Sequence, residues 1–128
     1  MLMKRFLSLS FFILLYTFTC QIHADNVTSQ INIQHVPKTG DHIEHYTPAD
    51  MPEVYYDSNS QEIIIVADGF ASYYDVDIVS QSTLLAVIST QVGGYGDTID
   101  ISSLPDDNYT IIITSSNDNV YQGQFTNY

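Results

Sequence analysis

Tryptophan is absent from this 128-residue sequence, cysteine occurs once, and Lys and Arg together number three against fifteen Asp and Glu. All fifteen acidic residues follow residue 24, where Lys38 is the only base, so that part of the chain carries a formal charge of −14. Such a surface repels nucleic acid and anionic membranes, and neither is an expected partner. The single cysteine, Cys20, precedes that part, so no disulfide is expected within the exported fold.

The first 24 residues have the pattern of a secretory signal peptide. Lys4 and Arg5 precede an apolar run over residues 6–18, and a polar stretch then ends at Ala24, a small residue suited to cleavage. The run is shorter than the ~20 residues that a membrane-spanning helix needs. The sequence therefore predicts export to the periplasm or the medium, without a stable transmembrane anchor.

Cys20 leaves a second route to the envelope open, in which cleavage occurs just before it and the thiol is acylated. The bulky Phe18 lies where lipoprotein signals carry small residues, so simple cleavage is favoured. Removal of residues 1–24 leaves 104 residues, which is the size of one β-sandwich domain. We expect this domain to be a monomer.

Short stretches of β-forming residues recur from residue 53 onward and predict about seven strands. They are residues 54–56, 62–66, 71–79, 84–90, 98–101, 109–114 and 120–126. Polar turn residues at 57–60 and 116–119 predict hairpins, which make the first and the last strand pairs antiparallel. Seven short strands at this spacing, with no helical period, are typical of an all-β, immunoglobulin-like antiparallel β-sandwich.

Residues 25–51 have a different character, because prolines, a glycine and polar residues interrupt them. We expect an irregular polar lead-in there, with Ile31 and Ile33 marking one possible edge strand, and a sandwich domain over residues 52–128. Within the sandwich, residues 62–66 are apolar at both alternating sets of positions, which favours a strand covered on both faces.

The stretch from Asp97 to Phe125 is the most informative, because it predicts a tyrosine corner. Tyr109 opens a strand directly after a polar turn, and in β-sandwiches such a phenol bonds back to upstream backbone, here around Leu104 to Asp106. The sequence lacks both the buried Trp and the disulfide of antibody domains, so it leans toward the fibronectin-like sandwiches.

Three segments carry a resemblance to a known family: residues 100–105 (Asp-Ile-Ser-Ser-Leu-Pro), 108–111 (Asn-Tyr-Thr-Ile) and 120–125 (Val-Tyr-Gln-Gly-Gln-Phe). They resemble small exported Bacteroidetes proteins that are classed as a domain of unknown function, with an immunoglobulin or fibronectin type III sandwich. The Leu-Pro-x-x-x-Tyr corner is also similar to C-terminal sorting domains of the type IX secretion system. Those domains usually end on a basic residue, whereas this sequence ends on Tyr128.

Motifs for catalysis are missing from the sequence. It has no Gly-x-Ser-x-Gly elbow and no thiol nucleophile after Cys20, and Gly94-Tyr95-Gly96 is followed by a strand pattern rather than the helix of a dinucleotide site. A small sandwich also offers no evident cleft for glycoside hydrolysis. We therefore expect no enzyme activity and no cofactor.

Two groups of residues, one of histidines and one of aspartates, are of types that can bind metal ions. In both groups we favour solvated side chains over a metal site. His35, His42 and His45 lie in the punctuated lead-in, where no fourth ligand is fixed. Asp75 and Asp77 share one face of a strand, but no calcium-loop pattern accompanies them. We expect no metal site.

Tyrosine is the most suggestive excess. Tyr74, Val76 and Ile78 are expected to face the core, which turns Tyr73, Asp75 and Asp77 outward. Tyr95 lies in a glycine-flanked loop. Exposed tyrosines suit sugar rings or peptide partners, although Tyr is also simply a good strand former. We take Tyr73, Asp75, Asp77 and Tyr95 as candidate ligand-binding residues.

Two functions remain open. The favoured one is a non-catalytic exported module that binds a polysaccharide or protein partner at the cell envelope through a strand edge or a Tyr and Asp face. The alternative is a sorting or assembly module that secretion or adhesion machinery recognises.

Overall fold

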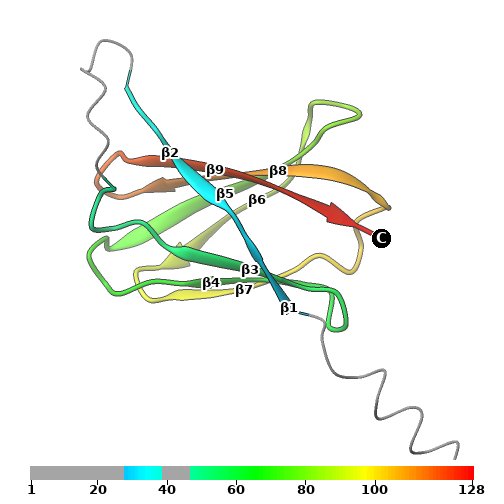
Figure 1. Ribbon diagram of the computed structural model, residues 1–128, viewed down its shortest axis with the longest axis horizontal. Coiled ribbons are helices and arrows are strands. Elements are labelled where there is room, and N and C mark those ends of the chain that lie inside the picture. The colour runs from blue at the N-terminus through cyan, green and yellow to red at the C-terminus, as the bar shows by residue number, and fades with distance from the viewer. Residues whose placement is uncertain (1–27, 39–46) are drawn as a thin grey trace, which may run out of the picture.

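The computed structural model describes residues 28–38 and 47–128, which form two antiparallel β-sheets packed face to face (Figure 1). The strands are β1 (Thr28–Ile31), β2 (Ile33–Val36), β3 (Glu53–Asp57), β4 (Glu62–Val66), β5 (Tyr73–Ser80), β6 (Ala86–Gly93), β7 (Gly96–Asp100), β8 (Asp107–Ser115) and β9 (Val120–Asn127). One sheet has the order β1-β3-β4-β7 and the other β2-β9-β8-β5-β6. The all-β antiparallel sandwich expected from the sequence is confirmed, and its hairpins at 57–60 and 116–119 join β3 to β4 and β8 to β9.

The strands β1 and β2 are one extended stretch that changes sheets at Asn32. β1 pairs with β3 in the first sheet, and β2 pairs with β9 in the second. Ile31 and Ile33 are both buried, since the chain passes from one layer to the other between them. Residues 28–36 therefore form two strands of the sandwich, where the sequence led us to expect at most one edge strand in an irregular lead-in.

Alternation between apolar and polar residues positions the core between the two sheets. Tyr74, Val76 and Ile78 of β5 are fully buried, as expected from their period of two. The expectation that β4 is covered on both faces was wrong. Ile63 and Ile65 are buried, but Val66 is 45% exposed and Ile64 only half-buried. β4 is central within its sheet, and its outer β-branched residues reflect strand propensity rather than cover.

The loop before β8 is fixed by side chains of the core. The Tyr109 hydroxyl donates to the backbone carbonyl of Pro105 at 2.5 Å, which is the geometry of a tyrosine corner. The Tyr109 ring stacks on Phe125 with centroids 5.4 Å apart. Asn127, almost fully buried, accepts from the Tyr56 hydroxyl at 2.8 Å and donates to the Leu104 carbonyl at 3.3 Å. These bonds join both sheets to the loop.

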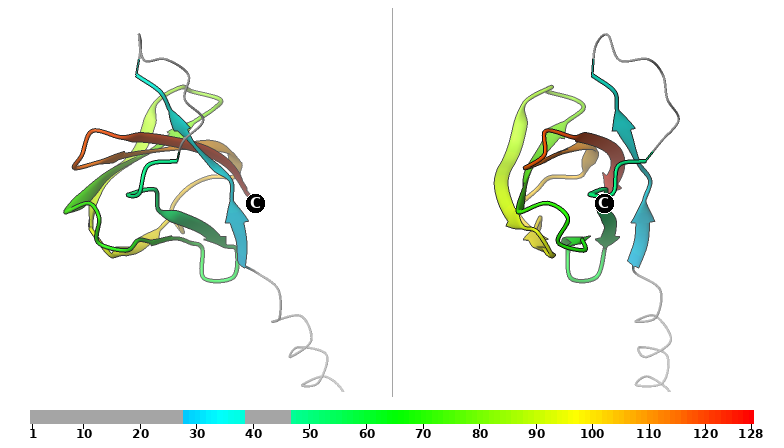
Figure 2. Two further views of the ribbon diagram at one scale, coloured as in Figure 1. Left: turned by 60° about the vertical axis from the view of Figure 1, so that its left-hand side comes forward. Right: turned by 90° about the vertical axis from the view of Figure 1, so that its left-hand side faces the viewer.

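The two sides of the sandwich differ in how their sheet edges are protected. The β1–β2 stretch runs along one side, where it pairs with β3 and β9 (Figure 2). On the opposite side β6 and β7 are the last strands of their sheets, joined by the Gly94-Tyr95 turn. The long β6 therefore has one unpaired backbone edge among the described residues.

Candidate binding face

Three of the predicted site residues lie together on the outer face of β5. Tyr73 is 40% exposed, Asp75 is exposed and Asp77 half-buried, while the residues between them point into the core. The Gln91 amide donates to Asp75 Oδ1 at 3.1 Å, and the Ser89 hydroxyl donates to Asp77 Oδ1 at 2.6 Å. The neighbouring strand β6 thus holds both carboxylates in place, which leaves their remaining lone pairs directed outward.

Strand register extends this face across all five strands of the sheet. Residues directly opposite each other in antiparallel strands point to the same side. One row contains Gln34, Gln122, Ile112, Asp77 and Ser89; the next contains Val36, Val120, Thr114, Asp75 and Gln91. Among the described residues no further element packs over these rows. The rows combine amides, hydroxyls and two carboxylates with the apolar side chains of Val36, Ile112 and Val120, and contain no Lys or Arg.

The sequence interpretation missed the part of this face that β2 and β9 contribute. The period of two in residues 120–126 was a sufficient signal, because Tyr121 and Phe125 are buried and Gln122 and Gln124 must then face outward. What the sequence did not contain was the pairing of β2 with β9, which brings Gln34 opposite Gln122.

Two hollows on this sheet meet at Gln124. One, about 430 Å³, is lined by Asn32, Gln34, Gln122 and Gly123 together with Gln124. The other, about 310 Å³, includes Gln81, Asn108 and Thr126. They lie where the β1–β2 stretch separates from β9 and crosses to the other sheet, because β2 pairs with β9 only as far as Gly123. Both are lined mainly by hydrogen-bonding side chains.

Tyr95 lies apart from the aspartates. Pairing of Tyr73 with Gly93 brings the β6–β7 turn to the same end of the sheet as Tyr73. The Tyr95 side chain, 78% exposed, rests on Gly69 in the β4–β5 loop, whose positive φ of 83° suits glycine. A methyl group at Gly69 would meet the Tyr95 ring at 2.9 Å. Tyr95 is therefore a feature of the end of the sandwich rather than of the β5 face.

No family model matches the chain, and no curated protein does. A solved structure described as a DUF3244 family protein with an immunoglobulin-like β-sandwich fold, from Bacteroides vulgatus ATCC 8482, is similar to it with a TM-score of 0.61. The two are 15% identical, and the match covers 79% of this chain and 99% of that chain. The chain has an immunoglobulin-like β-sandwich fold.

At one end of the immunoglobulin-like sandwich, Asp50 forms a buried hydrogen-bonded centre. Its carboxylate accepts from the Tyr121 hydroxyl, from Asn117 Nδ2 at 3.0 Å and from Asn119 Nδ2 at 3.1 Å. Its backbone carbonyl accepts from the Tyr74 hydroxyl at 2.7 Å. Burial raises the pKa of the Asp50 carboxyl, but hydrogen bonds from Ser115, Tyr121, Asn117 and Asn119 outweigh it, so the pKa lies below its ordinary value. These side chains of the protein surround a carboxylate that is almost fully buried, so we assign Asp50 a structural role.

A second carboxylate, Asp107, organises the opposite end of β5. The hydroxyls of Ser80 and Ser82 donate to Asp107 Oδ2 at 2.7 and 2.6 Å. These bonds, with one from the Asn108 backbone, hold the pKa of Asp107 below its ordinary value. The cluster fixes the loop after β5.

No group of three or more His, Cys, Asp or Glu side chains in residues 28–38 and 47–128 is arranged to hold a metal ion. His35 packs its ring against Tyr121, with centroids 5.7 Å apart. His42 and His45, the other two histidines of the zinc alternative, lie outside the described residues, as do Cys20 and the predicted signal peptide. Nor does the described part of the chain include a helix long and apolar enough to cross a membrane.

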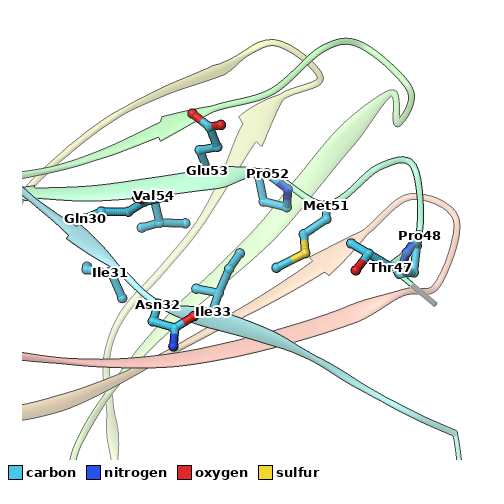
Figure 3. Close-up of a pocket in the computed structure, with 10 residues that line it drawn as sticks. All are labelled: Gln30, Ile31, Asn32, Ile33, Thr47, Pro48, Met51, Pro52, Glu53 and Val54. Carbon is cyan, nitrogen blue, oxygen red and sulfur yellow. The ribbon is translucent and has the colours of Figure 1, made fainter. Parts of the chain in front are cut away.

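A cavity of about 460 Å³ opens between the β1–β2 crossing and residues 47–54 (Figure 3). Ile33 and Met51 point into it, with Pro48 and Pro52 at its wall, whereas the carboxylate of Glu53 points away. The Glu53 carboxylate instead accepts a hydrogen bond from the Tyr55 hydroxyl at 2.8 Å. Among the described residues that line it, no aromatic ring and no ionisable group is directed inward, so we interpret this cavity as a packing crevice under the crossing strand.

Proposed function

We propose that this chain is a non-catalytic, exported binding module whose ligand is a neutral polysaccharide lying across the outer face of the sheet β2-β9-β8-β5-β6. Tyr73, Asp75 and Asp77 form one part of the contact, and Gln34, Gln122 and Gln124 the other. The module acts in the periplasm or at the cell surface.

The observation that carries this proposal is the pair of side-chain rows in register across five strands. Amides, hydroxyls and carboxylates are the groups that hydrogen-bond to sugar hydroxyls, and Tyr73 adds a ring for stacking. The charge of −14 after residue 24 disfavours uronic or sulfated polymers, because like charges repel at close range. A neutral glycan meets no such penalty.

Family and location are part of the same proposal. The solved neighbour is a Bacteroides protein of a family named as a domain of unknown function, which supports the sequence resemblance to small exported Bacteroidetes sandwiches. The fibronectin type III comparison is supported by the seven strands β3 to β9, which divide as three and four between the sheets. Export rests on the pattern of residues 1–24.

The proposal is tested by amide NMR of the ¹⁵N-labelled exported chain, titrated with neutral oligosaccharides, with uronic-acid oligosaccharides and with calcium. Saturable shifts confined to β2, β5, β6, β8 and β9 are expected with neutral sugars only. Tyr73→Ala should weaken binding about fivefold, since an exposed aromatic contact is worth on the order of 1 kcal/mol.

Tyr128→Ala is the matched control, because Tyr128 is more exposed than Tyr73 but lies beyond the end of β9. It should leave the affinity unchanged. Dispersed spectra that move with no neutral sugar would reject the glycan, and equal losses in both tyrosine variants would reject the face.

The second candidate, a sorting or assembly module, is favoured by one observation, the unpaired edge of β6. Secretion and adhesion systems recognise such edges by strand addition. The two functions differ in the fate of the chain: a sorting module is clipped or inserted into a partner sheet, whereas a binding module persists intact. Mass spectrometry of the chain isolated from its native envelope separates them.

A further inference from the structure

The four edges of the two sheets are protected to very different degrees. β1 and β2 are edges of four residues each, and β7 has five residues that include Asp97 and Asp100. Short length and charge are the usual devices that keep an edge from pairing with another chain. β6, in contrast, has eight residues and contains neither a charge nor a proline.

The absence of charge extends well beyond β6. From Ile78 to Gly96 the sequence has no Asp, Glu, Lys or Arg, in a chain that otherwise carries fifteen acids. The register shift at Ile78/Val79 affects only the first residues of β6, and from Ile88 to Gly93 the strand pairs regularly with β5. The free edge is therefore regular, neutral and long enough to add a further strand.

We propose that β6 pairs with β6 of a second copy of this chain, antiparallel, about a two-fold axis perpendicular to the sheet at Thr90. The two five-stranded sheets then form one sheet of ten strands. This replaces the monomer expected from the sequence, and it does not depend on the identity of the ligand.

The distribution of charge supports a second copy of this chain as the partner that pairs with the free edge of β6. Two copies at −14 repel each other wherever their carboxylates meet, and β6 is a long edge strand that carries no carboxylate. Within this sheet the nearest charges, Asp75 and Asp77, lie on β5, so three strand spacings, about 14 Å, separate them from their counterparts, while Asp97 and Asp100 of β7 belong to the other sheet. That exceeds the screening length of about 8 Å at physiological ionic strength.

The side chains along β6 are also complementary to themselves under this symmetry. Pairing about Thr90 sets Ile88 opposite Val92 of the other copy on the inner face, and Ser89 opposite Gln91 on the outer face. It also brings the Leu84-Leu85 end of one copy beside the Tyr95 end of the other. These three side chains are 79%, 66% and 78% exposed, so each end covers apolar surface that is otherwise open to water.

Joining the sheets has a functional consequence. The axis is perpendicular to the sheet, so the outer faces of both copies lie on the same side and form one continuous surface. A polymer that crosses it meets two equivalent sites, which raises avidity without any new contact.

Cysteine cross-linking tests the axis directly. Thr90 is the residue expected to lie opposite itself, at a Cα separation that a disulfide can span. In the full chain carrying Cys20→Ser, Thr90→Cys is the only thiol, and mild oxidation should yield a covalent dimer. Thr98→Cys, an exposed threonine on the other edge strand β7, is the matched control and should remain monomeric.

Analytical ultracentrifugation tests the association without a cross-link. The native chain should show a concentration-dependent dimer, and Thr90→Glu should weaken it at least about tenfold, because the axis sets two carboxylates opposite each other. Thr98→Glu should leave the dimer unchanged. A native chain that sediments as a monomer up to millimolar concentration, or Thr90→Cys cross-linking no faster than Thr98→Cys, overturns the proposal. If Thr90→Glu does not fold, the cross-linking comparison decides alone.

Discussion

Among single residues, Asp50 shows how the fold replaces a disulfide by hydrogen bonds. Its carboxylate joins residues before β3 to the β8–β9 turn, and its carbonyl joins them to Tyr74 of β5. These segments are 24 to 69 residues apart in the chain. A buried carboxylate is tolerated because four polar groups of the protein take the place of water around it.

Asp50→Asn should lower the free energy of unfolding by about 1.5 to 3 kcal/mol at neutral pH. The amide keeps the shape of the side chain, but it loses the charge to which Tyr121 and the two asparagines donate, and its NH₂ group faces donors. Urea unfolding measures the change. Asp118→Asn is the control in the same turn: Asp118 has a φ of 65°, which Asn tolerates, and its side chain is exposed, so no loss is expected. Equal losses in both variants would contradict the role of Asp50.

Low pH should remove the contribution of the Asp50 carboxylate to the free energy of unfolding. The folded-state pKa of Asp50 lies below its ordinary value of 3.8, so the unfolded chain binds the proton more tightly. The stabilisation is therefore fully present above about pH 4 and is lost as the pH falls through the folded-state pKa. Urea midpoints between pH 7 and pH 2 should fall less steeply for Asp50→Asn than for the native chain. Parallel curves would show that Asp50 titrates alike in both states.

Among the elements, the crossing of the β1–β2 stretch depends on a glycine in its partner strand. A methyl group at Gly123 would lie 2.8 Å from Ile33 Cγ2 and 2.9 Å from the Asn32 carbonyl oxygen. The lack of a side chain there allows the stretch to pass close to β9 while it changes sheets. This contact closes one side of the sandwich.

Gly123→Ala should destabilise the fold by about 1 to 3 kcal/mol, because the crossing stretch has to move away from β9. Amide hydrogen exchange should show the loss of protection concentrated in β1 and β2. Gly93→Ala is a matched control in a strand of the same sheet, since nothing lies within 4 Å of its added methyl group. Gly93→Ala lowers the conformational entropy of the unfolded chain, so we expect its effect on stability to be neutral or stabilising. Uniform loss of protection throughout the sandwich would contradict a local role for Gly123.

Local sequence patterns predict where the strands lie, but they predict less well which strands pair with one another in the sheets. The alternation of Tyr74, Val76 and Ile78 with Asp75 and Asp77 was enough to assign both faces of β5, because period two is a property of any half-buried strand. Residues 28–36 were harder, since a strand that changes sheets buries residues on both sides of the switch. The rows of the binding face depend on which strands pair across long sequence separations, and register of that kind is set by the whole sandwich.

For the whole molecule, the dominant property is an unbalanced charge. Lys38 is the only base after residue 24, so the fifteen carboxylates have almost no positive partners. Several are held by neutral donors instead, as Asp75 is by Gln91 and Asp107 by two serines. This arrangement fixes individual side chains but leaves the mutual repulsion of the carboxylates in place, and compaction increases that repulsion.

Sodium chloride should therefore stabilise the fold. The Debye length falls from about 30 Å at 0.01 M to about 8 Å at 0.15 M, so most of the rise in thermal midpoint should come below physiological ionic strength, with little further gain above it. Salt also favours the proposed dimer, so the scan is made on Thr90→Glu at low protein concentration, where only the intramolecular effect remains. Potassium chloride should give the same curve, because screening depends on ionic strength and not on the cation. A midpoint that falls with salt would mean that attractive charge pairs outweigh repulsion in this fold, and a response to only one of the two cations would indicate specific binding at the carboxylates.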